Sequence, residues 1–400
     1  MCSVKQTKWK AGVIFILLSL LLGQPIVSAE NGPDKANPAE NMENQLLNDI
    51  SLDGIHSFWK TLEHEYGGYV PELEKTSIYE FIKDNGSFSI KNTLWGVLEF
   101  LLHELILNGK LLGKLLLLTL FSVILQTIHT AFEKSAISKI AYYVVYIVLI
   151  FLALNSFYVA VSYAKDAIDT MSSFMIALLP LMLGIMATLG NVMTVSFFHP
   201  VIVFLINMSG VLVSKFILPL LFLAALLIIV SNLNENYSVS KLANLLKQVG
   251  MGTLGIFLTI FLGVMSVQGA TSAVQDGVAM KTTKFITGNF IPVVGRTFTD
   301  AADTILSASL LLKNAVGIAG VLIIVFIAIF PAIKIFAIAL IYKLAAAILQ
   351  PIGDGPVISV MDTISKYIVF ILAALLAVTL MFFLAIVILV AASNITILLR

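Results

Sequence analysis

The chain has 400 residues, of which 59% are hydrophobic and only 12% are charged, and its mean hydropathy is +1.00. This composition excludes an ordinary soluble globular protein and indicates a chain that lies in the lipid bilayer. The net charge of +1 argues against nucleic-acid binding, and the single cysteine, Cys2, excludes a disulfide framework and a cysteine-based zinc site.

Residues 1–29 have the features of a secretory signal peptide. Lysines precede the apolar run VIFILLSLLLG, which is followed by a proline and the small-residue sequence VSA. The apolar run is shorter than the roughly 20 residues that a membrane-spanning helix needs. We therefore predict cleavage between Ala29 and Glu30, with an uncleaved N-terminal anchor as the alternative.

Residues 30–91 are the one long polar region of the sequence. They hold 12 acidic and 5 basic residues, a net charge of −7. An acidic segment directly after a signal sequence belongs on the far side of the membrane, because positive charge is what the cytoplasmic side retains. We predict a small extracytoplasmic helical region, too short to bury more than a thin core.

The rest of the chain reads as membrane helices. Residues 92–110 predict an interfacial amphipathic helix, and residues 111–400 predict a polytopic membrane domain. Backbone groups in lipid must be hydrogen-bonded within their own segment, so the predicted fold is all-α. We predict seven to nine transmembrane helices, some kinked or re-entrant, over 111–131, 140–163, 171–189, 192–214, 216–232, 250–268, 314–333, 335–350 and 367–392.

The charges between these spans predict an orientation. Residues 133–139 and 234–248 carry lysines and are predicted to face the cytoplasm. Residues 165–170, the polar loop 269–313 and residues 351–366 would then face outward, together with the N-terminal region.

The outer loop 269–313 contains the stretch GNFIPVVGRTFTDAADT, residues 288–304, in which a Pro-Gly turn precedes charged residues. Charged, broken segments between spans are tolerated where they line water or meet a partner. As candidate pore-lining or partner-contact residues we name Asp276, Lys281, Lys284, Pro292, Gly295, Arg296, Asp300 and Asp303.

A simpler interpretation of these aspartates is local. The sequences DAIDT (166–170) and DAADT (300–304) are near copies, and MDTI (361–364) is similar. Asp and Thr are good N-caps, so all three could begin helices. In the alternative, Arg296, Asp300 and Asp303 share one helix face, since residues three and four apart are neighbours on a helix.

Polar residues also occur within or between the apolar runs. An ionisable side chain in lipid is costly, so such residues are functional candidates. The candidates are Asn207, Lys215, Lys334 and Lys343. In the alternative interpretation, the lysines lie at the ends of spans and extend to the membrane surface.

No catalytic or cofactor motif occurs. HExxH, the Walker A sequence, the dinucleotide fingerprint and Gly-x-Ser-x-Gly are all missing from the sequence. We therefore predict that the protein is not an enzyme and that it uses no metal or other cofactor.

The whole layout resembles one known family. A signal sequence, an acidic outer region, a polytopic helical body and FIPVVGRTFTDAADT in a polar outer segment are similar to stage III sporulation protein AE of endospore-forming Firmicutes. The resemblance implies residence in the mother-cell membrane around the forespore. It also implies work as the membrane core of a channel-like or secretion-like complex that joins the two cells and supports forespore development and late forespore gene expression.

The resemblance also implies partners. These are the other stage III sporulation A membrane proteins, a cytoplasmic secretion-type ATPase supplied in trans, and stage II sporulation protein Q across the intermembrane space. Membrane lipid and a second copy of the chain are further possible partners. From the residues alone, two other functions stay open: a self-contained solute permease, and a membrane scaffold that recruits partners through its outer region.

Overall fold

The computed structural model describes residues 53–83, 89–131, 136–231, 239–290, 295–352 and 356–398. Within these ranges every regular element is a helix, which confirms the predicted all-α fold. The predicted signal peptide with its cleavage site at Ala29 and Glu30, and also Pro292, lie outside the described residues. The described residues belong to one compact unit.

The acidic N-terminal region contributes three short helices. They are α3 (Asp53–Tyr66), α4 (Pro71–Lys75) and α5 (Ile78–Lys83). Trp59 of α3 and Phe81 of α5 are almost fully buried, and their ring centroids are 5.5 Å apart. Helix α3 contacts the long helices α8 and α12, and α5 contacts α12, so this region is packed onto the membrane domain.

Helices α6 (Ile90–Leu107) and α7 (Gly109–Ala131) form a bent pair, with a bend of 41° around Asn108. Together they are apolar enough to cross a membrane as one broken span. Leu94, Trp95 and Leu98 of α6 are all exposed. The predicted interfacial helix 92–110 therefore corresponds to α6 and the bend.

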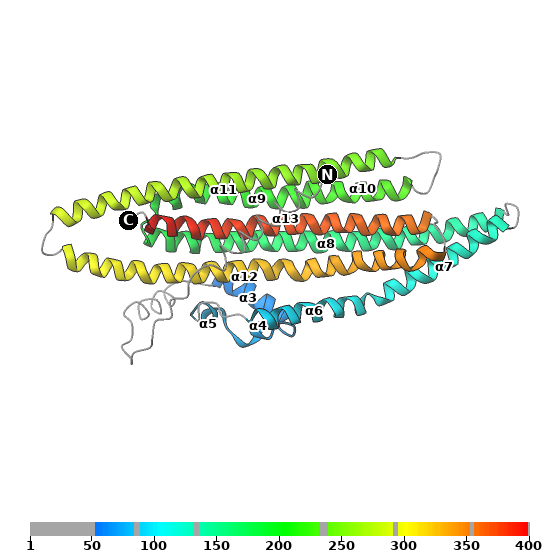
Figure 1. Cartoon of the computed structure of the whole chain (residues 1–400), viewed down its shortest axis with the longest axis horizontal. Helices are drawn as coiled ribbons and strands as arrows, with labels where there is room; N and C mark the ends of the chain where they lie inside the picture. The colour runs from blue at the N-terminus through cyan, green and yellow to red at the C-terminus, as the bar shows by residue number, and fades with distance from the viewer. Residues whose placement is uncertain are drawn as a thin grey trace, which may run out of the picture. The chain divides into compact units, whose positions relative to one another are not determined.

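The body of the molecule is a set of long helices that lie side by side (Figure 1). The set comprises α8 (Ala136–Thr188), α9 (Val192–Leu212) continued by the π-helical turn η1 (Val213–Ile217) into α10 (Leu218–Ser231), α11 (Ser240–Phe290), α12 (Gly295–Leu349) and, after the short 3₁₀ turn η2 (Gln350–Ile352), α13 (Pro356–Leu398).

The predicted number of spans is corrected by these lengths. The described residues contain five helices that are long and apolar enough to cross a membrane, or six with the bent pair, in place of seven to nine. Three pairs of segments predicted as separate spans are each one continuous helical stretch. These pairs are 140–163 and 171–189 in α8, 192–214 and 216–232 in α9, η1 and α10, and 314–333 and 335–350, which lie almost entirely in α12. The break at Gly190, which has a positive φ of 79°, was predicted correctly.

The other predicted breaks are helical for identifiable reasons. At Lys215 the chain forms the π-helical turn η1, directly before Pro219, which has no N–H to donate. The predicted loop 165–170 lies inside α8, where Ser214 donates a hydrogen bond of 3.2 Å to Asp169. Polar side chains that find partners on neighbouring helices do not require the backbone to leave the helix.

The aspartates predicted as N-caps lie inside helices instead. Residues 166–170 are in α8, 300–304 in α12 and 361–364 in α13, each at least a turn beyond the start of its helix. The predicted polar loop 269–313 is likewise helical up to Phe290 and again from Gly295.

The predicted orientation is also corrected. Helix α12 has 55 residues and is therefore about 80 Å long. Its two ends lie at opposite ends of the helical bundle (Figure 1), so 269–313 and 351–366 are not at one end of it, as the predicted orientation requires. At the C-terminal end of α12, Lys343 forms an ion pair with Asp362 of α13. Lys247 of α11, from the segment predicted to face the cytoplasm, lies 5.4 Å from the ring of Phe370, which closely follows the segment 351–366 predicted to face outward.

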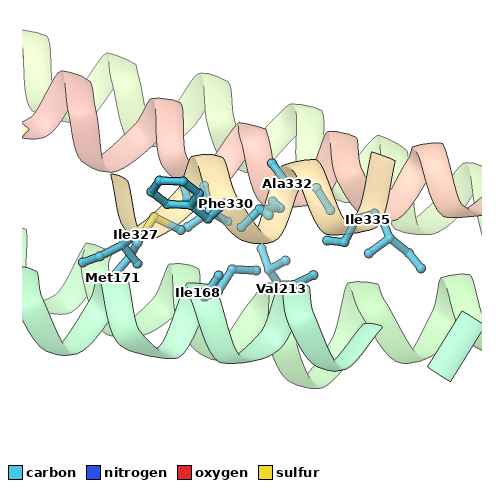
Figure 2. Packing of buried hydrophobic residues seen from close by; sticks show 14 of the residues in the cluster. Ile168, Met171, Val213, Ile327, Phe330, Ala332 and Ile335 are labelled. Carbon is cyan, nitrogen blue, oxygen red and sulfur yellow. The ribbon is translucent and has the colours of Figure 1, made fainter. Parts of the chain in front are cut away.

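The core lies where α12 packs against α8 and α13. Figure 2 shows Ile327, Phe330 and Ile335 of α12 gathered with Ile168 and Met171 of α8, and all five are buried. Two glycines of α12 permit close contact: a Cβ atom would lie 2.6 Å from Val390 at Gly317 and 2.8 Å from Leu178 at Gly320. Small residues at a helix contact allow the backbones to approach, which is how membrane helices gain packing energy.

Candidate functional site

The residues predicted to line a pore or meet a partner lie on the adjoining parts of two helices. Asp276, Lys281 and Lys284 belong to α11, whereas Gly295, Arg296, Asp300 and Asp303 belong to the first turns of α12. Lys281 is exposed and Asp276 is buried. The Lys281 side chain is therefore available to a partner, whereas the Asp276 side chain makes its contacts within the bundle.

Asp276 contacts the beginning of helix α9. Its carboxylate accepts a hydrogen bond of 2.9 Å from the backbone N–H of Thr194 and another from the Thr194 hydroxyl. The first N–H groups of a helix have no partner within that helix, and its N-terminus carries a partial positive charge. Asp276 of α11 thus supplies from a neighbouring helix the cap that α9 needs.

We expect Asp276→Ala to lower the free energy of unfolding by about 1.5–3 kcal/mol, because a buried charged hydrogen bond is lost and its donors remain. Asp276→Asn keeps an acceptor oxygen and should cost less. The measurement is chemical unfolding in detergent micelles. Lys281→Ala, an exposed change on the same helix, is the control, and an equal loss in that variant would contradict the capping role.

A second group of polar residues lies in the middle of the bundle, at the level of the predicted loop 165–170. Lys334 of α12 is half-buried, and its ammonium group is 5.3 Å from the ring centroid of Tyr163 and 5.9 Å from that of Phe100. These distances are within the range of cation–π contacts. Lys334 therefore joins α12 to α8 and α6 and does not mark a break between spans.

Beside Lys334 is a pocket of about 280 Å³ between the N-terminal region and the bundle. We call it the junction pocket. Its lining combines charged groups, hydroxyl groups and aromatic rings from α3, α8 and α12, namely Phe58, Thr61, Leu62, Glu65, Tyr66, Tyr163, Asp166, Ala167, Thr170, Ile327, Pro331 and Lys334. The short helix α3 thus completes a polar site that the long helices begin.

Tyr66 is the main contact of α3 at this junction. Its ring stacks on Phe330 of α12 with the centroids 3.7 Å apart and the planes at 7°. Burial, and then the adjacent Glu65 carboxylate, raises the pKa of the Tyr66 hydroxyl. The hydroxyl therefore stays protonated and can donate a hydrogen bond at physiological pH.

The two remaining polar candidates of α9 and η1 face outward. Asn207 is exposed and donates a hydrogen bond of 2.9 Å to the Val203 carbonyl of its own helix. Lys215 is exposed within the π-helical turn η1. Neither residue is among those that line the junction pocket.

Lys343, the fourth candidate, belongs to a charged cluster at the end of α12. Its ammonium group and that of Lys366 both contact the Asp362 carboxylate, the latter at 2.6 Å. The cluster borders a pocket of about 450 Å³, which we call the α12–α13 pocket. That pocket is lined by Lys343, Ala346, Ala347, Gln350, Ile358, Ser359 and Asp362.

The structure also reveals a buried lysine that the sequence interpretation missed. Lys313 of α12 has no exposed surface, and its ammonium group donates to the Val390 carbonyl at 3.2 Å and to the Asn394 side chain. Both acceptors belong to α13. Within the described residues, the charge is therefore held by two neutral oxygens.

Comparison with known proteins identifies the family. The family described as "Stage III sporulation protein AE" matches residues 73–393. The chain is 51% identical to "Stage III sporulation protein AE" of Bacillus subtilis (strain 168), over 99% of this chain and 100% of that protein. No solved structure matches the chain. On the family match and this identity, the helical protein described above belongs to the stage III sporulation protein AE family.

Proposed function

We propose that the protein is the membrane core of a multiprotein channel or secretion-like complex that connects mother cell and forespore. Membership of the family implies a role in sporulation. We place the chain in the mother-cell membrane around the forespore, with the acidic N-terminal region outside the cytoplasm. The proposed partners are the other stage III sporulation A proteins, an ATPase supplied in trans, and stage II sporulation protein Q.

The observation that carries this proposal is the junction pocket. In it, a region expected outside the cytoplasm packs onto the middle of long apolar helices and encloses charged groups with them. Polar backbone and side chains at membrane depth are tolerated where they are buried in protein or line water. A membrane body with a polar interior, joined to an outer docking region, suits the central component of an assembly.

The permease is a second candidate because the described residues contain two pockets with charged linings, the junction pocket and the α12–α13 pocket. The two functions differ in what the isolated protein can do. A permease carries solute by itself, whereas the core of a complex requires its partners.

The test is photocrosslinking in sporulating cells. A photoreactive amino acid at Lys60 of α3, or at Lys281 of α11, should crosslink to other stage III sporulation A proteins or to stage II sporulation protein Q. Both positions are exposed, and Ile147, an exposed apolar residue of α8, is the control. Absence of these crosslinks, combined with solute flux by the purified chain in liposomes, would favour the permease.

A further inference from the structure

The α12–α13 pocket has the size and lining of a ligand site. Its volume of about 450 Å³ is within the range of roughly 300–1,000 Å³ that small-molecule sites occupy. It opens between the end of α12 and the beginning of α13. The proposed channel function gives this pocket no role. The question is which chemical group its side chains would bind.

The charged cluster that borders the pocket favours an anion. Lys343, which lines the pocket, and Lys366, which does not, share the single carboxylate of Asp362, so the cluster carries one uncompensated positive charge. The Lys343 side chain is 56% exposed, so its ammonium group can also reach a ligand in the pocket. Asp362 holds the two lysines in place and at the same time competes with any bound anion.

Uncharged donors complete the site. Ser359 and Gln350 line the pocket with hydroxyl and amide groups. Ile358 and Ser359 stand in the first turn of α13, which begins at Pro356. The Ile358 N–H has no acceptor within the helix, and the N-terminal end of a 43-residue helix attracts negative charge.

The position of the pocket identifies the source of the anion. It lies at one end of two candidate spans, Ser309–Leu349 and Pro356–Ala392. Next to Lys343 on α12, the apolar side chains of Leu344 and Ile348 are 40% and 51% exposed. A lysine at the end of an apolar helix, beside exposed apolar residues, is at the depth where lipid headgroups meet acyl chains.

We propose that the α12–α13 pocket binds the phosphate group of an anionic phospholipid. Lys343 contacts the phosphate, the first turn of α13 and Ser359 donate hydrogen bonds, and Leu344 and Ile348 contact the acyl chains. Asp362 limits the affinity, because its carboxylate occupies the lysines when the lipid is absent.

The experiment uses the full chain in detergent, titrated with phosphatidylglycerol or phosphatidylcholine and followed by native mass spectrometry. The wild-type protein should prefer phosphatidylglycerol. Lys343→Ala should weaken that binding about fivefold, the factor expected for one lysine beside an anionic lipid. Lys241→Ala removes an exposed lysine of α11 that does not line the pocket, and should leave binding unchanged.

The decisive variant is Asp362→Asn, which should strengthen phosphatidylglycerol binding because both lysines are released. A variant that merely misfolds would not bind the lipid more tightly, so this gain separates the site from a loss of structure. Equal binding of the two lipids, or unchanged binding in both Lys343→Ala and Asp362→Asn, would overturn the proposal. Displacement of the lipid by an equal concentration of inorganic phosphate would overturn the lipid assignment and identify soluble phosphate as the ligand.

Discussion

Replacing Phe330 with alanine is expected to release the N-terminal helices from the bundle and to lower the free energy of unfolding by about 3–5 kcal/mol. Phe330 has no exposed surface. Its ring stacks on Tyr66 of α3 and makes an edge contact with Phe100 of α6, with the centroids 5.0 Å apart. A single side chain of α12 therefore holds two N-terminal elements, and its loss leaves a cavity where they meet.

The buried Trp59 of α3 reports this release directly. In a background with Trp9→Phe and Trp95→Phe, Trp59 is the single remaining tryptophan. Its fluorescence should become accessible to iodide in the Phe330→Ala protein at temperatures where the long helices are still intact. Circular dichroism of the same samples measures whether those helices persist.

Two controls separate the stacking contact from a general loss of packing. Phe336→Ala removes a ring from the same helix at a position that is 40% exposed, and should change Trp59 little. Tyr66→Phe keeps the ring that stacks on Phe330 and should preserve docking. Iodide access that rises equally in Phe336→Ala would contradict the role of Phe330 as the docking residue.

The sequence was sufficient to predict helices and their apolar character, because hydropathy alone decides which segments lipid accepts. It was not sufficient to predict where the helices end. Lys215, Lys334 and the run 165–170 resembled interruptions, yet each lies within a helix. A charge interrupts a span only if no neighbour satisfies it, and the ring of Tyr163 beside Lys334 comes from another helix far away in sequence.

The same limit applies to the candidate site. Asp276 was selected for its charge, but its contact with Thr194 depends on how α11 and α9 pack. Lys313 was included as the last residue of the predicted polar loop 269–313, although the apolar residues that follow it were a usable signal. A single lysine at the edge of a long apolar run predicts either an interface position or a buried charge, and only the fold distinguishes them.

Lys313 itself provides the second large expected effect. We expect Lys313→Glu to lower the free energy of unfolding by several kcal/mol, because the new carboxylate would face the Val390 carbonyl and the Asn394 side-chain oxygen in a buried place. We expect Lys313→Met, which has similar length and no charge, to cost much less, because it leaves two neutral oxygens without this donor but places no new charge in the interior. Thermal unfolding in detergent micelles measures both.

Spore yield then separates packing from function at this position. A charge buried at membrane depth is costly and usually serves a functional role. We therefore expect Lys313→Met to fold and reach the membrane normally, yet to lower the number of heat-resistant spores in an endospore-forming host. Lys241→Ala, which removes an exposed lysine of α11 to which no partner contact is assigned, tests whether the loss of any lysine has this effect. A normal spore yield from a stable Lys313→Met protein would reduce Lys313 to a packing residue between α12 and α13.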